Sequence, residues 1–94
     1  MPRLFVAPAA KEDVREISRY IARDNLPASR DWVSSIQHKF RLLAKHPHLG
    51  EKRKDLGNDI RVVSHGSYVI YFRLSKPRLE IVRAIRGDRD VKML

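Results

Sequence analysis

The spacing of apolar residues changes once along this chain, and that change limits the folds the chain can adopt. Between residues 9 and 46 the apolar side chains recur every three or four positions, which is the period of an amphipathic helix. From residue 60 to residue 85 they form short runs rich in β-branched and aromatic residues, which are typical of strands. We expect residues 1–94 to form one domain, since chains normally divide only well above this length.

The first half is predicted to be a hairpin of two helices. The apolar face of the first helix consists of Ala10, Val14, Ile17 and Ile21. The charged residues of this helix are expected to face water; they are Lys11, Glu12, Asp13, Arg15 and Glu16. Residues 25–27 interrupt the helical pattern before a second helix, whose buried stripe is Val33, Ile36, Phe40, Leu43 and Ala44, broadened by Trp32. Because the connection is short, the two helices should lie antiparallel.

The remaining segments are predicted to be strands. Residues 4–6 form a first strand, and residues 60–63, 68–74 and 79–85 form three more, joined by turns at 65–67 and 75–77. Three consecutive strands with tight turns predict an antiparallel meander. The expected fold class is therefore α+β with the order β-α-α-β-β-β, in which the helical hairpin packs on one face of an antiparallel sheet. The other face is expected to be open and partly basic.

The charge balance indicates an acidic partner. The chain has 20 Lys and Arg residues against 11 Asp and Glu, a net charge of +9, which favours nucleic acid, a nucleic-acid machine or an acidic protein segment. Cysteine is absent, which excludes disulfides and thiolate metal sites and fits a reducing cytoplasm. Apolar runs are too short for a bilayer, and the four histidines lack a metal-binding pattern. We expect a cytoplasmic protein without metal, cofactor or membrane contact.

Several short motifs occur in an order that resembles the ParE/RelE superfamily of bacterial toxins. They are residues 4–10 before the charged helix, residues 46–50, Leu56 with residues 60–61, residues 66–73, residues 79–85, and residues 87–90. Together they cover nearly the whole chain. The resemblance implies the same β-α-α-β-β-β fold.

The resemblance also implies a toxin of a type II toxin–antitoxin system, of the kind linked to plasmid stabilization. RelE-type members are ribosome-dependent mRNA endonucleases, whereas ParE-type members inhibit DNA gyrase. Val69 stands where RelE-type toxins carry an arginine, although Arg89 matches a basic RelE position, and no terminal tyrosine occurs up to Leu94. RNA cleavage requires groups that take and give a proton, and the acid–base partner expected for it is missing from this sequence. We therefore favour the ParE-type, non-enzymatic interpretation, although Arg86 replaces a histidine common there; a RelE-like endonuclease and a plain nucleic-acid-binding module remain alternatives.

The ParE-type interpretation implies particular partners. A cognate ParD-like antitoxin would wrap an acidic C-terminal segment around the hairpin and the sheet, forming a hetero-oligomer. DNA gyrase would be the target, and DNA would be contacted only indirectly, through the antitoxin.

Two sets of residues are candidates for these contacts. The target-binding candidates are Arg83, Arg86, Arg89 and Lys92, which recur every three residues. They would share one stripe in a wound tail, whereas Arg83 and Arg86 would point to opposite faces in an extended strand. The antitoxin-binding candidates are Trp32, Phe40, Tyr71 and Arg73. For Arg73 an internal ion pair with Glu80 is the competing interpretation. The basic cluster at residues 52–54 is a further candidate for contact with a phosphate or an acidic group, and simple solvation is the competing interpretation.

Overall fold

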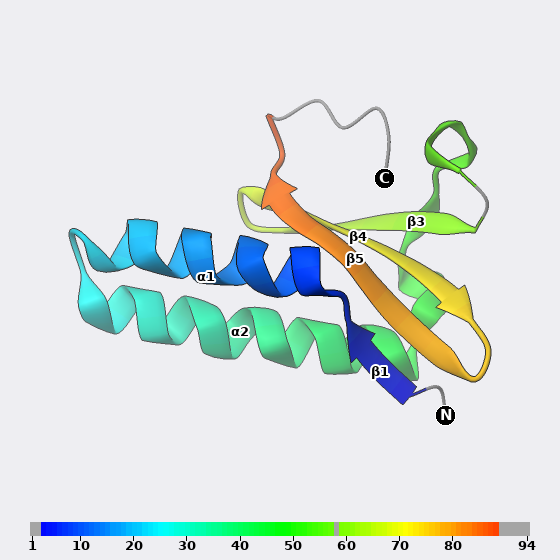
Figure 1. Cartoon of the computed structure of the whole chain (residues 1–94), viewed down its shortest axis with the longest axis horizontal. Helices are drawn as coiled ribbons and strands as arrows, with labels where there is room; N and C mark the ends of the chain where they lie inside the picture. Colours follow the sequence, from blue (N-terminus) through cyan, green and yellow to red (C-terminus); the bar gives the residue numbers. More distant parts are fainter. Residues whose placement is uncertain (1–2, 58, 89–94) are drawn as a thin grey trace.

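The computed structural model describes residues 3–57 and 59–88. The described residues form two long helices beside a five-stranded sheet, with the hairpin extending past one end of the sheet (Figure 1). The helices are α1 (Pro8–Ala22) and α2 (Leu26–Lys45), and two short 3-10 helices are η1 (Pro47–Leu49) and η2 (Lys54–Leu56). The strands are β1 (Arg3–Val6), β2 (Glu51–Lys52), β3 (Ile60–His65), β4 (Tyr68–Ser75) and β5 (Arg78–Arg86). The predicted α+β class and the helical hairpin are confirmed.

Local polar contacts fix the turn between the helices. The side chain of Asn25 caps α2 by accepting a hydrogen bond from the amide of Ala28 at 3.0 Å. Ser29, with 2% of its surface exposed, donates from its hydroxyl to the carbonyl oxygen of Ser18 at 2.7 Å. The first bond stabilises the start of α2, and the second ties the first turn of α2 to α1. Within the described chain, neither helix is long and apolar enough to cross a membrane.

The sheet is mixed, which corrects the prediction of a purely antiparallel sheet. Its strand order is β1-β5-β4-β3-β2. The pairs formed by β3, β4 and β5 are antiparallel, as expected for a meander, but β1 lies parallel to β5, with Val6 opposite Ile81. The short strand β2 was not expected; it pairs antiparallel to β3. Parallel neighbours need a long connection, and the connection between β1 and β5 contains both helices and the other three strands.

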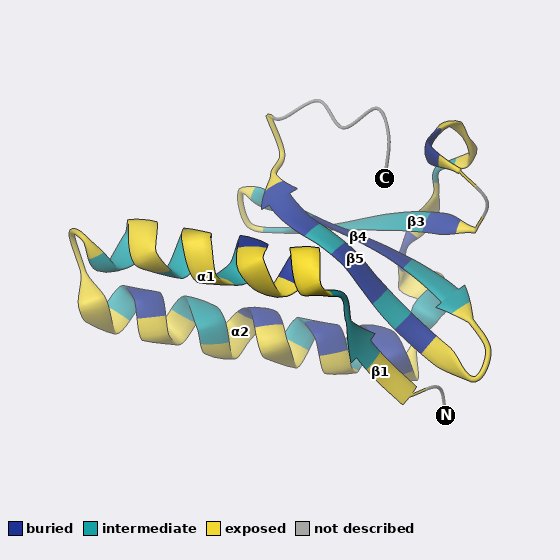
Figure 2. Cartoon of the chain, viewed as in Figure 1, coloured by how far each residue is buried: buried dark blue, intermediate teal, exposed yellow. Residues whose placement is uncertain are grey.

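Apolar residues are buried on both faces of the sheet (Figure 2). The main core lies between the helices and the sheet and consists of Ala10, Ile36, Phe40, Leu43, Ile70, Phe72, Leu79, Ile81 and Ala84. The opposite face was expected to be open, but it holds a second cluster. This cluster consists of Leu56, Ile60, Tyr71, Val82 and Ile85. Leu56 belongs to η2, so the loop between β2 and β3 covers part of this face. Sequence patterning did not predict that cover.

Candidate interaction surfaces

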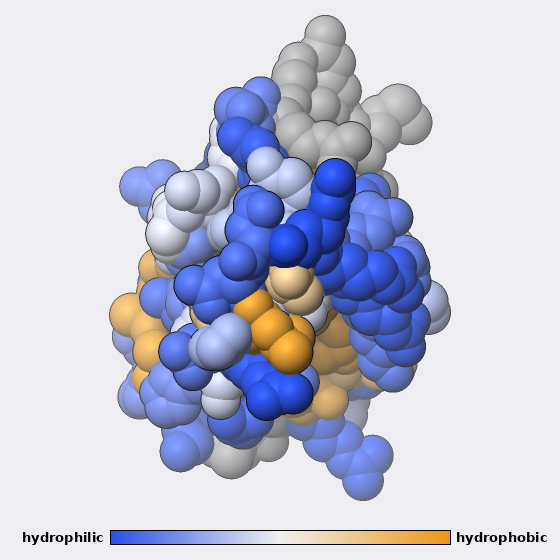
Figure 3. Space-filling model, turned by 90° about the vertical axis from the view of Figure 1, so that its left-hand side faces the viewer, coloured by the Kyte–Doolittle hydropathy of each residue, from blue (hydrophilic) through white to orange (hydrophobic). Residues whose placement is uncertain are grey.

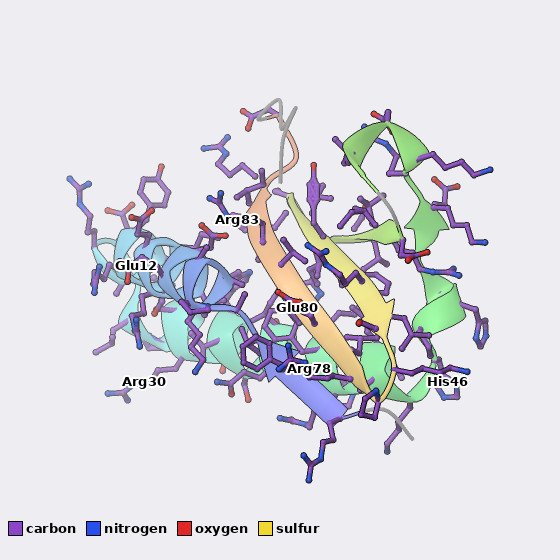
Figure 4. The ribbon with its side chains drawn as sticks, turned by 45° about the vertical axis from the view of Figure 1, so that its right-hand side comes forward. Glu12, Arg30, His46, Arg78, Glu80 and Arg83 are labelled. Atoms are coloured by element: carbon purple, nitrogen blue, oxygen red, sulfur yellow. The ribbon has the colours of Figure 1, made fainter. Side chains whose placement is uncertain are left out.

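Arg83 binds an acidic residue of α1, near the point where β5 passes this helix (Figure 4). Its Nε and Nη2 atoms donate to Oδ2 and Oδ1 of Asp13 at 2.7 and 2.9 Å. This side-on geometry satisfies both carboxylate oxygens, and the hydrogen bonds raise the pKa of Arg83 above its ordinary value, against the opposing effect of burial. The guanidinium of Arg83 therefore holds α1 on the sheet.

Asp13 itself was expected to face water, and that prediction is wrong. The residue is 8% exposed, and its Oδ2 atom also accepts a hydrogen bond from the amide of Ala84 at 3.0 Å. The pairing of β1 with β5 ends at Val6 and Ile81, so the edge of β5 beyond that point lacks a strand neighbour. Asp13 supplies the acceptor that the missing strand would have supplied. Helical periodicity could not reveal this, because it depends on where α1 crosses β5.

A β-bulge in the pairing of β4 with β5 determines to which face of the sheet the Arg83 side chain points. Phe72 pairs with Ile81 and Tyr71 pairs with Arg83, which leaves Val82 without an opposite residue. The extra residue shifts the alternation of side chains, so that Ala84 instead of Arg83 enters the main core.

β5 remains extended to Arg86, so the extended-strand alternative holds for Arg83 and Arg86, and they do not form one stripe. The Arg86 side chain is 58% exposed and lies 3.4 Å from Oδ2 of Asp88. Arg89 and Lys92 lie outside the described residues.

Arg73 has the neighbour that sequence spacing predicted. It pairs directly with Glu80 across β4 and β5, and its Nε atom lies 3.8 Å from Oε1 of the carboxylate. That distance is within ion-pair range but too long for a hydrogen bond, and the buried Nε atom has no hydrogen-bond partner. The pair is therefore loose, and 38% of the Arg73 side chain stays exposed.

The three aromatic antitoxin-binding candidates occupy different environments. Trp32 is half-buried, with its ring 5.3 Å from that of Tyr68. Phe40 is 3% exposed in the main core, and Tyr71 is 7% exposed in the second cluster. Phe40 and Tyr71 therefore offer almost no surface to a partner in this conformation, whereas Trp32 and Arg73 retain some.

A surface groove runs along the helical hairpin. Two adjoining hollows of about 540 and 420 Å³ share Ser18, Val33 and Gln37. Their other apolar lining residues are Val6, Val14, Ala22, Leu26 and Phe40. Their cationic lining residues are Lys11, Arg15, Arg19 and Arg30. We call this surface the hairpin groove. The joined end of the hairpin shows apolar patches between hydrophilic side chains (Figure 3). Leu26 is 50% exposed.

The other sequence candidates have simple surroundings. In the basic loop cluster, Arg53 donates two hydrogen bonds to Asp55 at 2.9 and 2.8 Å, which lowers the pKa of that carboxyl. His65 lies at the end of β3, where its Nε2 atom is 3.0 Å from the hydroxyl of Ser35. Among residues 3–57 and 59–88, no cluster of three or more side chains is suited to hold a metal ion.

Comparison with known proteins identifies the family. Residues 4–91 match the family model described as "ParE toxin of type II toxin-antitoxin system, parDE". The chain belongs to the ParE toxin family. A ParE relative, Toxin ParE1 of Caulobacter vibrioides, is 29% identical over 84 residues, which cover 88% of this chain and 86% of the relative. It follows that the chain is a toxin of a type II toxin–antitoxin system, as the motif order implied.

A solved structure shows that the ParE fold is shared. A chain of the structure described as "Chromosomal ParDE TA system from P. aeruginosa" superposes with a TM-score of 0.78. The match covers 92% of this chain and 96% of that chain at 19% identity. The helical hairpin on a sheet is therefore a fold shared with a chain of that ParDE system, which agrees with the family assignment.

Proposed function

We propose that this ParE-family toxin acts by binding DNA gyrase, without catalysis of its own, and that a ParD-like antitoxin neutralises it. The antitoxin's acidic C-terminal segment would fold on the hairpin groove, giving a hetero-oligomer. Membership of the ParE family supports the pairing with an antitoxin. The observation that supports antitoxin binding at this surface is the apolar floor of the groove, which has cationic residues along its rim.

The chemistry of the groove fits an amphipathic acidic helix. Val14, Val33 and Leu26 offer apolar contacts, while Lys11 and Arg30 stand at the margins. A helix placed in such a groove buries one apolar face and leaves its acidic residues near the cations. Apolar burial would supply most of the affinity, and opposite charge would speed the encounter.

The rim also contains charges that are already partly balanced within α1. Arg15 and Arg19 lie 3.3 and 3.5 Å from the two carboxylate oxygens of Glu12. Lys11 and Arg30 form no ion pair within the described chain and are therefore the rim cations most available to an acidic partner. This difference predicts that the antitoxin's carboxylates lie nearer Lys11 and Arg30 than Arg15.

A supercoiling assay tests the proposed target. Purified toxin should block the supercoiling of relaxed plasmid by gyrase, and an equimolar amount of antitoxin should restore it. A catalytically independent topoisomerase that relaxes the same plasmid serves as the control and should be unaffected. Supercoiling that persists at a large molar excess of toxin would refute gyrase as the target, and primer extension that detects cuts in translated messages would refute the non-enzymatic assignment.

A further inference from the structure

The two helices differ in charge although they lie side by side. The segment Pro8–Ala22 contains three basic and three acidic residues and is neutral, whereas Leu26–Lys45 contains four basic residues and one acidic residue, a net charge of +3. A substantial part of the chain's +9 charge is therefore on α2. This charge is not required for the stability of the hairpin, because the described ion pairs all join residues outside α2.

Basic residues of α2, including two of its four Lys and Arg residues, lie on the side of the helix opposite its buried residues. His38, Arg41 and Lys45 follow one another at spacings of three and four residues, which places them on one helical face. All three are exposed, and Ile36, Phe40 and Leu43 on the opposite side are buried. The exposed face thus presents a row of hydrogen-bond donors over about two helical turns, roughly 10 Å long at 1.5 Å per residue.

A hollow of about 640 Å³ adjoins this row, between α2 and the end of β3. Its polar lining is formed by Ser34, Ser35, His38, Lys39 and Arg41 of α2 and by His65 of β3. Asp31 is the acidic residue of the lining, and it lies ten positions before Arg41, about 15 Å away along the helix axis. The end of the hollow nearest Arg41 and Lys45 is therefore positive.

The state of His65 agrees with a positive potential in this hollow. Burial and the nearby charge of Lys39 lower the pKa of the imidazole below its ordinary value. Ser35 holds the ring at 3.0 Å through its hydroxyl. An anion bound beside Lys39 would oppose both effects and favour the imidazolium form.

We propose that this surface, the α2 cationic face formed by Ser35, His38, Lys39, Arg41, Lys45 and His65, binds the phosphate backbone of duplex DNA. Lysine, arginine, serine and histidine donors are suited to phosphate oxygens, which receive most protein–DNA hydrogen bonds. A protein partner would require an apolar centre in the interface. Here the apolar lining residue is Leu42, which is half-buried. The positive charge suits either anionic partner, and the lack of an apolar centre favours DNA over an acidic protein.

This inference depends on the proposed function in one respect, the choice of DNA over RNA, because gyrase acts on DNA. It also departs from the sequence-based expectation that the chain contacts DNA only through the antitoxin. A toxin that touches both the enzyme and its bound duplex would bind the complex more tightly than either component. The hollow beside the α2 cationic face and the hairpin groove lie on adjoining flanks of α2. Ser34 lines both, whereas Arg30, Val33 and Gln37 line the groove and not the hollow.

The test measures binding of the full chain, free of antitoxin, to a fluorescently labelled 20-base-pair duplex by anisotropy over a range of salt concentrations. We expect a dissociation constant in the micromolar range at low salt, as for other non-specific DNA contacts. Arg41→Gln with Lys45→Gln should weaken binding about tenfold. The double variant should also reduce the slope of log K against log salt by about two, since each phosphate contact contributes about 0.9.

The matched control removes two exposed cations elsewhere, Arg23→Gln with Lys76→Gln, and should change affinity less than twofold. Circular dichroism would verify that both double variants are folded. Equal losses in the two double variants would show a diffuse charge effect and overturn the site. Undetectable DNA binding at low salt, or tighter binding to duplex RNA of the same sequence, would overturn the proposal while leaving gyrase inhibition to be judged by the supercoiling assay.

Discussion

The carboxylate of Asp13 and the guanidinium of Arg83 form a two-point contact between residues 70 positions apart, with distances of 2.7 and 2.9 Å. The same carboxylate accepts the amide of Ala84. The contact therefore joins the second turn of α1 to the edge of β5 just beyond the end of β1. It satisfies the amide of Ala84, a fully buried residue that lies beyond the last residue of β5 paired with β1.

Replacement of Asp13 by Asn should lower the free energy of unfolding by about 2 kcal/mol, because it removes the charge that faces Arg83 and weakens the acceptor for Ala84. Partial exposure of Arg83, 35% of its side chain, keeps the loss below that of a fully buried ion pair. Urea unfolding measures the change. Glu12→Gln on the same helix removes two exposed ion pairs, with Arg15 and Arg19, and should cost less than about 1 kcal/mol. Equal effects of the two substitutions would contradict the role of Asp13.

Gly50 has no room for a side chain. A Cβ atom there would lie 2.5 Å from Cζ of Phe72, a fully buried ring of the main core. Gly50→Ala should therefore destabilise the fold by about 1–3 kcal/mol through overpacking, measurable as a lower thermal midpoint. In the background of Phe72→Leu, whose smaller side chain vacates part of this space, the added methyl group should cost clearly less. An unchanged cost in that background would show that Phe72 is not the cause.

Leu26 should contribute to antitoxin binding as an exposed apolar residue of the hairpin groove. Leu26→Ser should weaken antitoxin binding about tenfold, about 1.4 kcal/mol, because it removes apolar surface that the partner would cover. Leu49→Ser is a matched control, since Leu49 is 47% exposed against 50% for Leu26 but lies on η1, outside the groove. Isothermal titration calorimetry with purified antitoxin separates the two. Similar affinities for both variants would place the antitoxin elsewhere.

Arg83 and Arg86 should respond differently to substitution, although both were target-binding candidates. Arg83→Gln should lower stability by about 1–2 kcal/mol, because it leaves Asp13 with a weaker partner. Arg86→Gln should leave stability within about 0.5 kcal/mol, because the side chain is 58% exposed, and should weaken gyrase inhibition severalfold if the residue contacts the target. Unfolding curves and supercoiling titrations of both variants provide the comparison. Full inhibition by Arg86→Gln would remove this residue from the target surface.

His65 should make stability depend on pH below neutrality. Because burial and Lys39 lower its pKa from the ordinary 6.5, the unfolded chain binds a proton at a higher pH than the folded chain does. The free energy of unfolding should therefore fall as pH decreases from 6.5 toward the lowered pKa, and this contribution should level off below it. Denaturation at several pH values should show a weaker dependence for His65→Gln than for His48→Gln. Identical pH profiles for the two variants would contradict the assignment.

Much of the fold followed from residue spacing alone. The apolar residues of α2 predicted its buried face, with Ile36, Phe40 and Leu43 in the main core. The turn predicted at residues 65–67 is confirmed: Gly66 has a φ of 61° and lies between β3 and β4. The order of motifs predicted the ParE family. These features are local, because periodicity and turn chemistry depend on neighbouring residues in the chain.

The functional surfaces were less accessible to sequence reasoning. Phe40 and Tyr71 were expected at the antitoxin surface, yet both side chains are almost completely covered. The α2 cationic face was not singled out, because its Lys and Arg residues are ordinary surface cations in the sequence, and only the fold places His65 beside Ser35 and Lys39.

The sequence by itself determined the two helices, the strands β1, β3, β4 and β5, their order along the chain, and the face that α2 buries. The tertiary structure decided that β1 runs parallel to β5, that Val82 has no partner in the sheet, and that Asp13 is buried against Arg83. The physical reason is that side-chain period specifies which face of an element is apolar, whereas burial of a polar group depends on the donors that a distant segment brings to it. For Asp13 those donors come from β5 and exist only after the helix has docked beyond the end of β1.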